Sequence, residues 1–343
     1  MNTITYYVQR YRPQFEAISK EVQLLATHFS SKGNIHIYDL HLDGLFSFQF
    51  KKNITSHHFA YYPLLFLRAR HFSQKSRLNH IVTSLGDFPY LPILKLKNTI
   101  LTAAGSCQVS KIRKRVKYLQ QVSKIIVESG KQKYDLLQLG IAEDKIELIY
   151  PPVDLAKFTF QPASGPFNIL YASCPTRKKD FHRRGIGLLL SLAEEQPDLK
   201  ISLAWRKGAY KDIKDIVKSI PNINVSNEIF PDMNRLYAQA HCTIIPYAKF
   251  DDYLKLIPNS AVESLAAGKP LLVSSQTELA KIVEKEGCGI VFEPNIESLQ
   301  QALAKLKKEY ATFQKRCLPT AQKHFSQSSF LEKYQLIYAA HGI

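Results

Sequence analysis

The chain has 343 residues, enough for two domains, and its 45% hydrophobic and 22% charged residues are those of an ordinary soluble globular protein. It has no apolar run near the ~20 residues of a membrane span, no signal-peptide layout and no CxxC pair among five cysteines, which argues against a membrane-spanning protein, a zinc site and a disulfide framework. The formal charge of +17 indicates an anionic partner such as a membrane surface, a phosphorylated glycan or a nucleic acid.

The first half of the chain alternates strand-like apolar runs with amphipathic helical stretches. Helices are predicted for residues 15–29 and 135–140, and strands for residues 4–9, 34–38, 80–84, 99–103, 124–128 and 146–150. The pair Pro151-Pro152 stops both helix and sheet, so the chain leaves the first group of elements there.

The second half repeats this rhythm and ends in a long helix. Strands are predicted for residues 168–172, 200–204, 223–225, 242–245, 270–273 and 289–292. Helices are predicted for residues 187–195, 211–218, 233–239, 278–285 and 326–340. Such alternation indicates an α/β protein with two Rossmann-like domains, each a parallel sheet covered on both faces. Ligands then bind beyond the carboxyl ends of the strands, in a cleft between the domains.

The most informative stretch is 258–270, which predicts a loop, a short helix and a tight turn into a strand. Glu263 is a lone carboxylate in a helix of small and apolar residues, and Gly268 and Pro270 end that helix. Burying a carboxylate is costly unless hydrogen-bond donors surround it, and two vicinal ribose hydroxyls would supply two donors. The alternative is an ordinary surface helix whose glutamate faces water.

Several segments, in this order, resemble the retaining glycosyltransferases of the GT-B fold, group 1 (family 4-like): residues 123–129, 149–158, 169–172 with Arg184-Gly185, and 258–270. Phe325-Ser326 and the last helix resemble the family's terminal segment, which crosses back to the first domain. The resemblance implies an acceptor domain at 1–158 plus 326–343, and a nucleotide-sugar donor domain at 159–325, facing a central cleft. It covers most of residues 120–340 and is weak before residue 120.

The chain also departs from the family's pattern. The family's usual Glu-x7-Glu has its second glutamate at Glu263, whereas the first position holds Lys255, which leaves the identity of the sugar open. A Gly-Gly loop near the amino terminus is absent, and the usual first-domain histidine corresponds to Ala104.

The donor site expected from the resemblance lies in the second half. Arg184 is the best candidate for the diphosphate, with Arg177 or Lys178 as the second cation, because arginine suits bidentate phosphate contact and a helix start adds an anion site. The other expected donor-binding residues are Arg206, Ile229, Pro258, Asn259, Ser260 and Glu263. Two alternatives stay open: a solvated basic loop around Arg177, and a surface charge packed by Trp205 at Arg206.

In the first half, Asp87 is the only acidic residue between 51 and 127 and could orient the acceptor, or it could fix its own turn. A retaining enzyme of this family needs no dedicated base if the leaving phosphate takes the acceptor proton. Catalysis would rest on Arg184, Lys178 and Asp87 through positioning and charge. No metal or other cofactor is expected beyond the substrate, a UDP- or GDP-linked sugar, because Asp251-Asp252 is a bare pair.

The positive charge concentrates in the first half: residues 51–134 hold 16 Lys and Arg against 2 acidic residues. The stretches 58–70 and 111–118 fit an anionic membrane surface, although a core helix with a basic solvent face explains the first equally well.

We therefore predict a cytoplasmic hexosyltransferase, peripheral on the inner membrane face, that glycosylates a glycan or lipid-linked acceptor in cell-envelope or polysaccharide biosynthesis. The alternatives are a catalytically inactive GT-B binding module and a nucleic-acid-binding protein using the basic domain; no nucleic-acid motif accompanies the charge, so nucleic acid is not an expected partner. The oligomeric state stays open.

Overall fold

The computed structural model describes residues 3–9, 11–14, 16–39, 49–51, 54–56, 62–85, 91–107, 112–175, 178–205, 217, 220–249, 254 and 257–343. The chain divides into two units. The first comprises Met1–Pro151 and Ser328–Ile343 with a short piece containing Leu254, and the second comprises Pro152–Asp251 and Leu256–Gln327. The sequence-based division after residue 158 lies slightly later in the chain than this change at Pro151.

The first unit contains a sheet in the order β3-β4-β2-β1-β5-β6-β7-β8. All of its described pairings are parallel except that of β3 with β4. The strands are β1 (Thr3–Val8), β2 (Asn34–Asp39), β3 (Gln49–Lys51), β4 (Ile54–Ser56), β5 (Leu78–Leu85), β6 (Thr99–Cys107), β7 (Lys124–Val127) and β8 (Ile146–Leu148).

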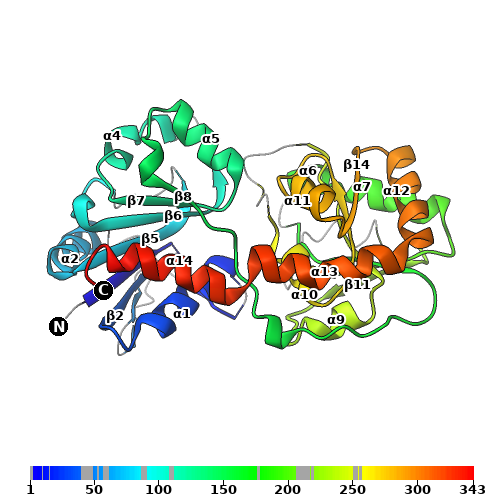
Figure 1. Cartoon of the computed structure of the whole chain (residues 1–343), viewed down its shortest axis with the longest axis horizontal. Coiled ribbons are helices and arrows are strands. Elements are labelled where there is room, and N and C mark those ends of the chain that lie inside the picture. Colours follow the sequence, from blue (N-terminus) through cyan, green and yellow to red (C-terminus); the bar gives the residue numbers. More distant parts are fainter. Residues whose placement is uncertain are drawn as a thin grey trace. The chain divides into compact units, whose positions relative to one another are not determined.

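Helices cover both faces of this sheet, as the alternation of apolar side chains along the strands requires. On one face, Tyr7, Ile81 and Val127 pack with residues of α2 (Tyr62–Lys75), α4 (Val116–Leu119) and α5 (Gly130–Gln138). On the other, neighbouring strand residues pack with α1 (Ala17–Phe29) and α14 (Gln327–Ala339). Figure 1 shows α14, drawn in red, running beside the first sheet with the carboxyl terminus near β5.

A buried chain of hydrogen bonds fixes α14 to the sheet. The Tyr334 hydroxyl lies 2.8 Å from Thr102 Oγ1, which lies 2.7 Å from Nε2 of His80. Nδ1 of His80 lies 2.6 Å from the Tyr338 hydroxyl, which donates to the Tyr6 hydroxyl at 3.2 Å. Since the Tyr338 proton goes to Tyr6, its oxygen accepts from Nδ1, and Nε2 accepts from Thr102. Burial lowers the pKa of His80 to about 3, so its ring is neutral, as this pattern needs.

The second unit contains a parallel sheet in the order β11-β10-β9-β12-β13-β14. Its strands are β9 (Asn168–Tyr171), β10 (Lys200–Trp205), β11 (Ile223–Asn227), β12 (Cys242–Ile245), β13 (Leu271–Ser274) and β14 (Gly289–Phe292). The chain builds outward from β9 to β11 on one side, then returns to place β12 against β9 and builds outward to β14 on the other. The neighbouring strands β9 and β12 therefore mark the topological switch point of this sheet.

The described helices of the second unit are α6 (Lys178–Arg183), α7 (Ile186–Glu195), α9 (Asn234–Ala238), α10 (Asn259–Ala266), α11 (Leu279–Glu286), α12 (Ile296–Lys308) and α13 (Tyr310–Phe325). α7 and α12 pack on one face of the sheet around Ile169 and Tyr171. Leu170, whose side chain points the other way, packs with Tyr237 of α9 and with Ala267 at the end of α10. The two faces are thus filled by alternating residues of one buried strand.

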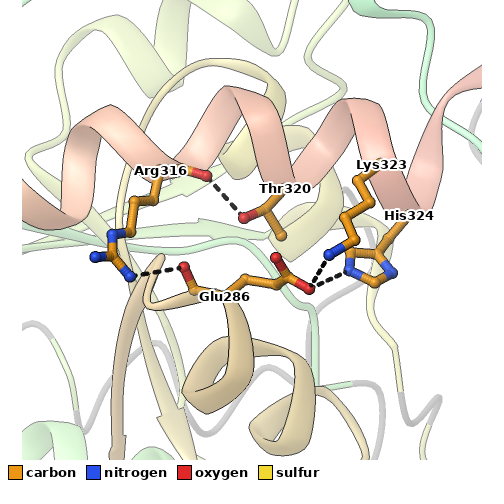
Figure 2. Close-up of polar contacts among 5 residues, drawn as sticks. All are labelled: Glu286, Arg316, Thr320, Lys323 and His324. Carbon is orange, nitrogen blue, oxygen red and sulfur yellow. Dashed lines mark hydrogen bonds and ion pairs between the residues drawn. The ribbon is translucent and has the colours of Figure 1, made fainter.

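The end of α11 is anchored on α13, as Figure 2 shows. Glu286 Oε1 accepts hydrogen bonds from Lys323 Nζ at 2.9 Å and from His324 Nε2 at 2.8 Å. These two donors hold the pKa of the Glu286 carboxyl below its ordinary value. Gly287, which ends α11 with φ +63°, lies against the Arg316 side chain, where an added Cβ would be 2.6 Å from Nη1. α13 therefore holds the turn that leads into β14.

The structure corrects several predicted elements. The helix predicted at 135–140 is α5 and begins at Gly130, because the Ser129 side chain caps it by accepting from the Gln132 amide. The basic stretch predicted as a loop before α7 contains α6. β3, β4, α12 and α13 were not predicted, and the helix predicted at 211–218 falls mostly outside the described residues. No helix in the described part of the chain is long and apolar enough to cross a membrane.

Candidate active site

The candidate site lies at the carboxyl edge of the second sheet, at the switch point between β9 and β12. These strands pair in parallel through Cys242 with Ile169 and Thr243 with Leu170, so the segments that follow them emerge at the same edge. The segment after β9 leads to Arg184, and the segment after β12 leads to α10. Because α10 connects two parallel strands, it runs back along the sheet and its amino terminus lies at that edge. Two of the predicted donor-binding segments therefore converge here.

Gly185 sets the position of Arg184 against β12. It precedes α7 with φ +67°, a conformation that favours glycine. A Cβ at this position would lie 1.6 Å from the carbonyl oxygen of Pro246, directly after β12. The amide of Ala248 also donates to the Arg183 carbonyl at 3.1 Å. The turn between α6 and α7 is thus packed on the end of β12 with no space for a side chain.

The guanidinium of Arg184 is largely buried beside the end of β9. Nη1 donates to the Ser173 hydroxyl, whereas Nε is buried and makes no hydrogen bond of standard geometry to a described residue. The Tyr171 hydroxyl is also buried without a hydrogen bond of standard geometry to a described residue. Burial raises the pKa of Tyr171, and the positive charge of Arg184 partly counters that rise. A largely buried cation at a strand end is suited to an anionic ligand.

The first turn of α10 contributes further polar groups. Pro258 is the N-cap residue, and no side chain caps the helix, so its first amides are available to a ligand. Oδ1 of Asn259 is buried without a partner among the described residues, and Ser260 is nearly buried. The amides of this helix start could bind an anion or a sugar hydroxyl.

Glu263 is half-buried on α10, not on an open helix face. The Tyr237 hydroxyl lies 3.0 Å from its Oε2 and 2.9 Å from the Ser260 carbonyl oxygen. Tyr237 itself is fully buried, and burial, followed by the negative charge of Glu263, raises its pKa well above the ordinary value. The hydroxyl stays protonated and donates. This partner could not be predicted from the sequence, because a tyrosine in a helix is most simply interpreted as a core residue.

The remaining predicted residues are placed only in part. Ile229 follows β11 and is 51% exposed. Lys178 begins α6, and nothing is described of its side chain. Arg177, Arg206, Asp87 and Lys255 lie outside the described residues.

Two further predictions concern the first unit and metals. Ala104 lies in β6 with 1% of its surface exposed and packs into the core, so its side chain faces no open site. Among the described residues, no group of three His, Cys, Asp or Glu side chains could hold a metal ion. The expected absence of a metal cofactor stays a prediction.

Known structures share the fold across nearly the whole chain. Sucrose-phosphate synthase from Thermosynechococcus elongatus matches with a TM-score of 0.73 at 15% identity, covering 99% of both chains. A glycosyltransferase from Rickettsia africae matches with a TM-score of 0.77 at 17% identity, covering 99% of this chain and 98% of the other. HepE of Anabaena, solved with UDP and glucose, matches with a TM-score of 0.78 at 13% identity over 99% and 100%. The predicted GT-B fold is confirmed.

Part of the second unit also resembles a known family in sequence. Residues 190–309 match the model of the glycosyl transferases group 1. Over these residues the chain is similar to the group 1 glycosyltransferases. The matched residues include α10 with Glu263, Tyr237 and the strands β10 to β14, while Arg184 lies just before them. No curated protein matches the chain by sequence.

Proposed function

We propose that this protein is a glycosyltransferase that moves a hexosyl group, with retention of configuration, from a UDP- or GDP-linked sugar to a glycan or lipid-linked acceptor. The observation that carries the proposal is the convergence of Arg184 and the start of α10 at the switch point between β9 and β12. Arg184 supplies a buried cation for the diphosphate, and α10 supplies Glu263 for the ribose. These are the two recognition elements that a nucleoside diphosphate requires.

The chemistry then rests on charge and position. Cleavage of the bond from the sugar to the diphosphate places negative charge on the leaving oxygen, which the Arg184 guanidinium stabilises, with Lys178 or Arg177 as the second cation. The departing phosphate accepts the proton of the acceptor hydroxyl as the new glycosidic bond forms on the same face. Asp87 orients the acceptor, and no metal takes part.

Solved relatives of the same fold support the choice of donor and acceptor. HepE of Anabaena has been solved in complex with UDP and with UDP-glucose. WaaG, a glycosyltransferase involved in lipopolysaccharide biosynthesis, matches 93% of this chain with a TM-score of 0.69 at 12% identity. A uridine donor and an acceptor of cell-envelope or polysaccharide biosynthesis are the first combination to test.

We further propose that the enzyme works in the cytoplasm on the inner face of a membrane. In the first unit, α2 and α4 pack on the same sheet face, and exposed cations lie on both: Arg70, Lys75 and Lys117, with Arg113 and Lys114 directly before α4. Leu67 on α2 is 68% exposed among these charges. Cations around an exposed leucine favour an anionic lipid surface.

The test is a panel of UDP-, GDP- and ADP-sugars, measured for binding and for slow sugar release. We expect one base to bind, and Glu263→Ala to weaken that binding roughly tenfold or more, as loss of a charged hydrogen-bond acceptor predicts. Glu284→Ala, an exposed glutamate of α11, is the matched control and leaves binding unchanged. Binding without sugar release would favour a catalytically inactive module. Failure of every donor to bind would rule the proposal out.

A further inference from the structure

The Tyr237 hydroxyl has one proton and two acceptors within reach. They are the Ser260 carbonyl at 2.9 Å and Glu263 Oε2 at 3.0 Å. Ser260 lies in the first turn of α10, where its carbonyl also faces the amide one turn later, so it has a helical donor. The carboxylate is the stronger acceptor. The Tyr237 hydroxyl therefore donates mainly to Glu263. This hydrogen bond fixes one oxygen of the carboxylate on the side of α10 that faces Tyr237.

Tyr237 is itself held in place by the segment that enters the second unit. The ring of Phe158 packs edge-on against it, with ring centres 5.9 Å apart. The next residue, Thr159, is fixed to α9: its amide donates to Oδ1 of Asn234 at 3.3 Å, and Nδ2 of Asn234 donates to its hydroxyl at 3.2 Å. Asn234 begins α9 and Tyr237 lies one turn later, so the contacts of Phe158 and Thr159 fix this helix and the segment to each other.

The same segment is also fixed to the turn that ends α10. Lys269 is fully buried, and its ammonium donates to the Gln161 carbonyl at 2.5 Å and lies 5.1 Å from the ring centre of Phe160. That ring covers Gly268, where an added Cβ would lie 2.9 Å from it. Residues 158–161 thus contact α9 at one end and the end of α10 at the other, and Tyr237 bridges the two helices at Glu263.

We propose that Tyr237 is a positioning residue for the donor: its hydroxyl orients the Glu263 carboxylate toward the ribose hydroxyls, so that it selects ribonucleotides over deoxyribonucleotides. The inference rests on the proposed function, because it takes Glu263 as the acceptor for the ribose. Tyr237 contacts no substrate atom. It sets the direction in which the Glu263 carboxylate points, so it affects the binding of the ribose and not of the other parts of the donor.

The experiment compares the binding of UDP and GDP with that of their 2′,3′-dideoxy forms. Wild type is expected to bind one of the two ribonucleotides, and to bind it more tightly than its dideoxy form by about tenfold. Tyr237→Phe keeps the ring and removes the donor, so this preference falls several-fold while affinity for the dideoxy form stays the same. Tyr310→Phe is the matched control: it removes a tyrosine hydroxyl that donates to a backbone carbonyl, that of His241 at 2.9 Å, and leaves the preference unchanged.

The outcomes separate the two proposals. If neither UDP nor GDP binds wild type, the proposed function fails, and this inference fails with it. If wild type prefers the ribonucleotide and Tyr237→Phe keeps the full preference, only this inference is overturned. An equal loss of affinity for both forms also overturns it, because a purely structural role would weaken all binding. Should Tyr237→Phe not fold, Phe158→Leu decides, since it loosens the ring without removing the hydroxyl and must lower the same preference.

Discussion

At the residue scale, Gly185 has the most demanding surroundings of the site. Gly185→Ala adds a Cβ 1.6 Å from the Pro246 carbonyl oxygen and imposes strain at φ +67°. We expect a loss of about 3 kcal/mol or more in the free energy of unfolding, from overpacking and backbone strain together. Gly165→Ala is the matched control, because Gly165 has φ +80° with open space around it, and strain alone costs about 1 kcal/mol. Urea unfolding measures both, and equal losses would contradict the close packing.

Arg184 is the residue on which the proposed chemistry depends most. Arg184→Ala is expected to lower kcat about 100-fold, the usual cost of removing one group that stabilises developing negative charge. Arg235→Ala removes an exposed arginine from the same unit and should leave kcat unchanged. Steady-state kinetics with the preferred donor provide the measurement. A full kcat in Arg184→Ala would mean that another cation neutralises the leaving group.

The sequence pointed to Arg184 and Glu263 because their neighbours are informative: a glycine directly after one, and small residues around the other. It could not point to Tyr237, since its contact with Glu263 joins residues far apart in the chain and depends on how α9 and α10 pack. Nor could it place Ala104, whose burial is decided by the neighbouring strands. Local sequence patterns indicate which residues belong to the candidate site, whereas tertiary packing determines what surrounds each of them.

At the element scale, the attachment of α14 to the first sheet depends on a neutral histidine. The pKa of His80 is about 3 in the folded chain and near 6.5 when exposed, so the unfolded state binds the additional proton. The contribution of His80 to stability is complete above pH 6.5 and is lost as the pH falls toward 3. We expect His80→Gln to be less stable than wild type at pH 7, yet to lose less stability between pH 6.5 and pH 4. Urea unfolding across that range tests it, and identical slopes would contradict a buried neutral ring.

Most strands of the second unit were predictable because they are short apolar runs between turn residues, as β12 and β13 are. The short strands β3 and β4 were missed because three residues carry too little periodicity. The start of α5 was missed because its signal is a side-chain cap at Ser129, not an apolar pattern. α13 was missed although it anchors α11 through Glu286, a contact that only the fold creates (Figure 2).

At the scale of the whole molecule, the net charge of +17 predicts what the surface binds and does not predict the fold. We expect the protein to bind vesicles containing anionic phospholipid and not vesicles of phosphatidylcholine alone, with binding that weakens as salt rises. A variant with Arg113, Lys114 and Lys117 all changed to Glu should lose most of this binding. The matched control changes Lys305, Lys307 and Lys308 of the second unit. Vesicle sedimentation distinguishes them, and equal losses would mean that total charge, not this face, drives binding.

The measurement that tests the account most directly is the crystal structure of the protein with the nucleoside diphosphate that binds in solution. We predict the diphosphate at the carboxyl ends of β9 and β12, with its oxygens within hydrogen-bond reach of the Arg184 guanidinium, and the ribose hydroxyls on the Glu263 carboxylate. A nucleotide bound at this edge with its ribose turned away from Glu263 would contradict the role of α10. A nucleotide bound elsewhere in the molecule would contradict the donor site itself.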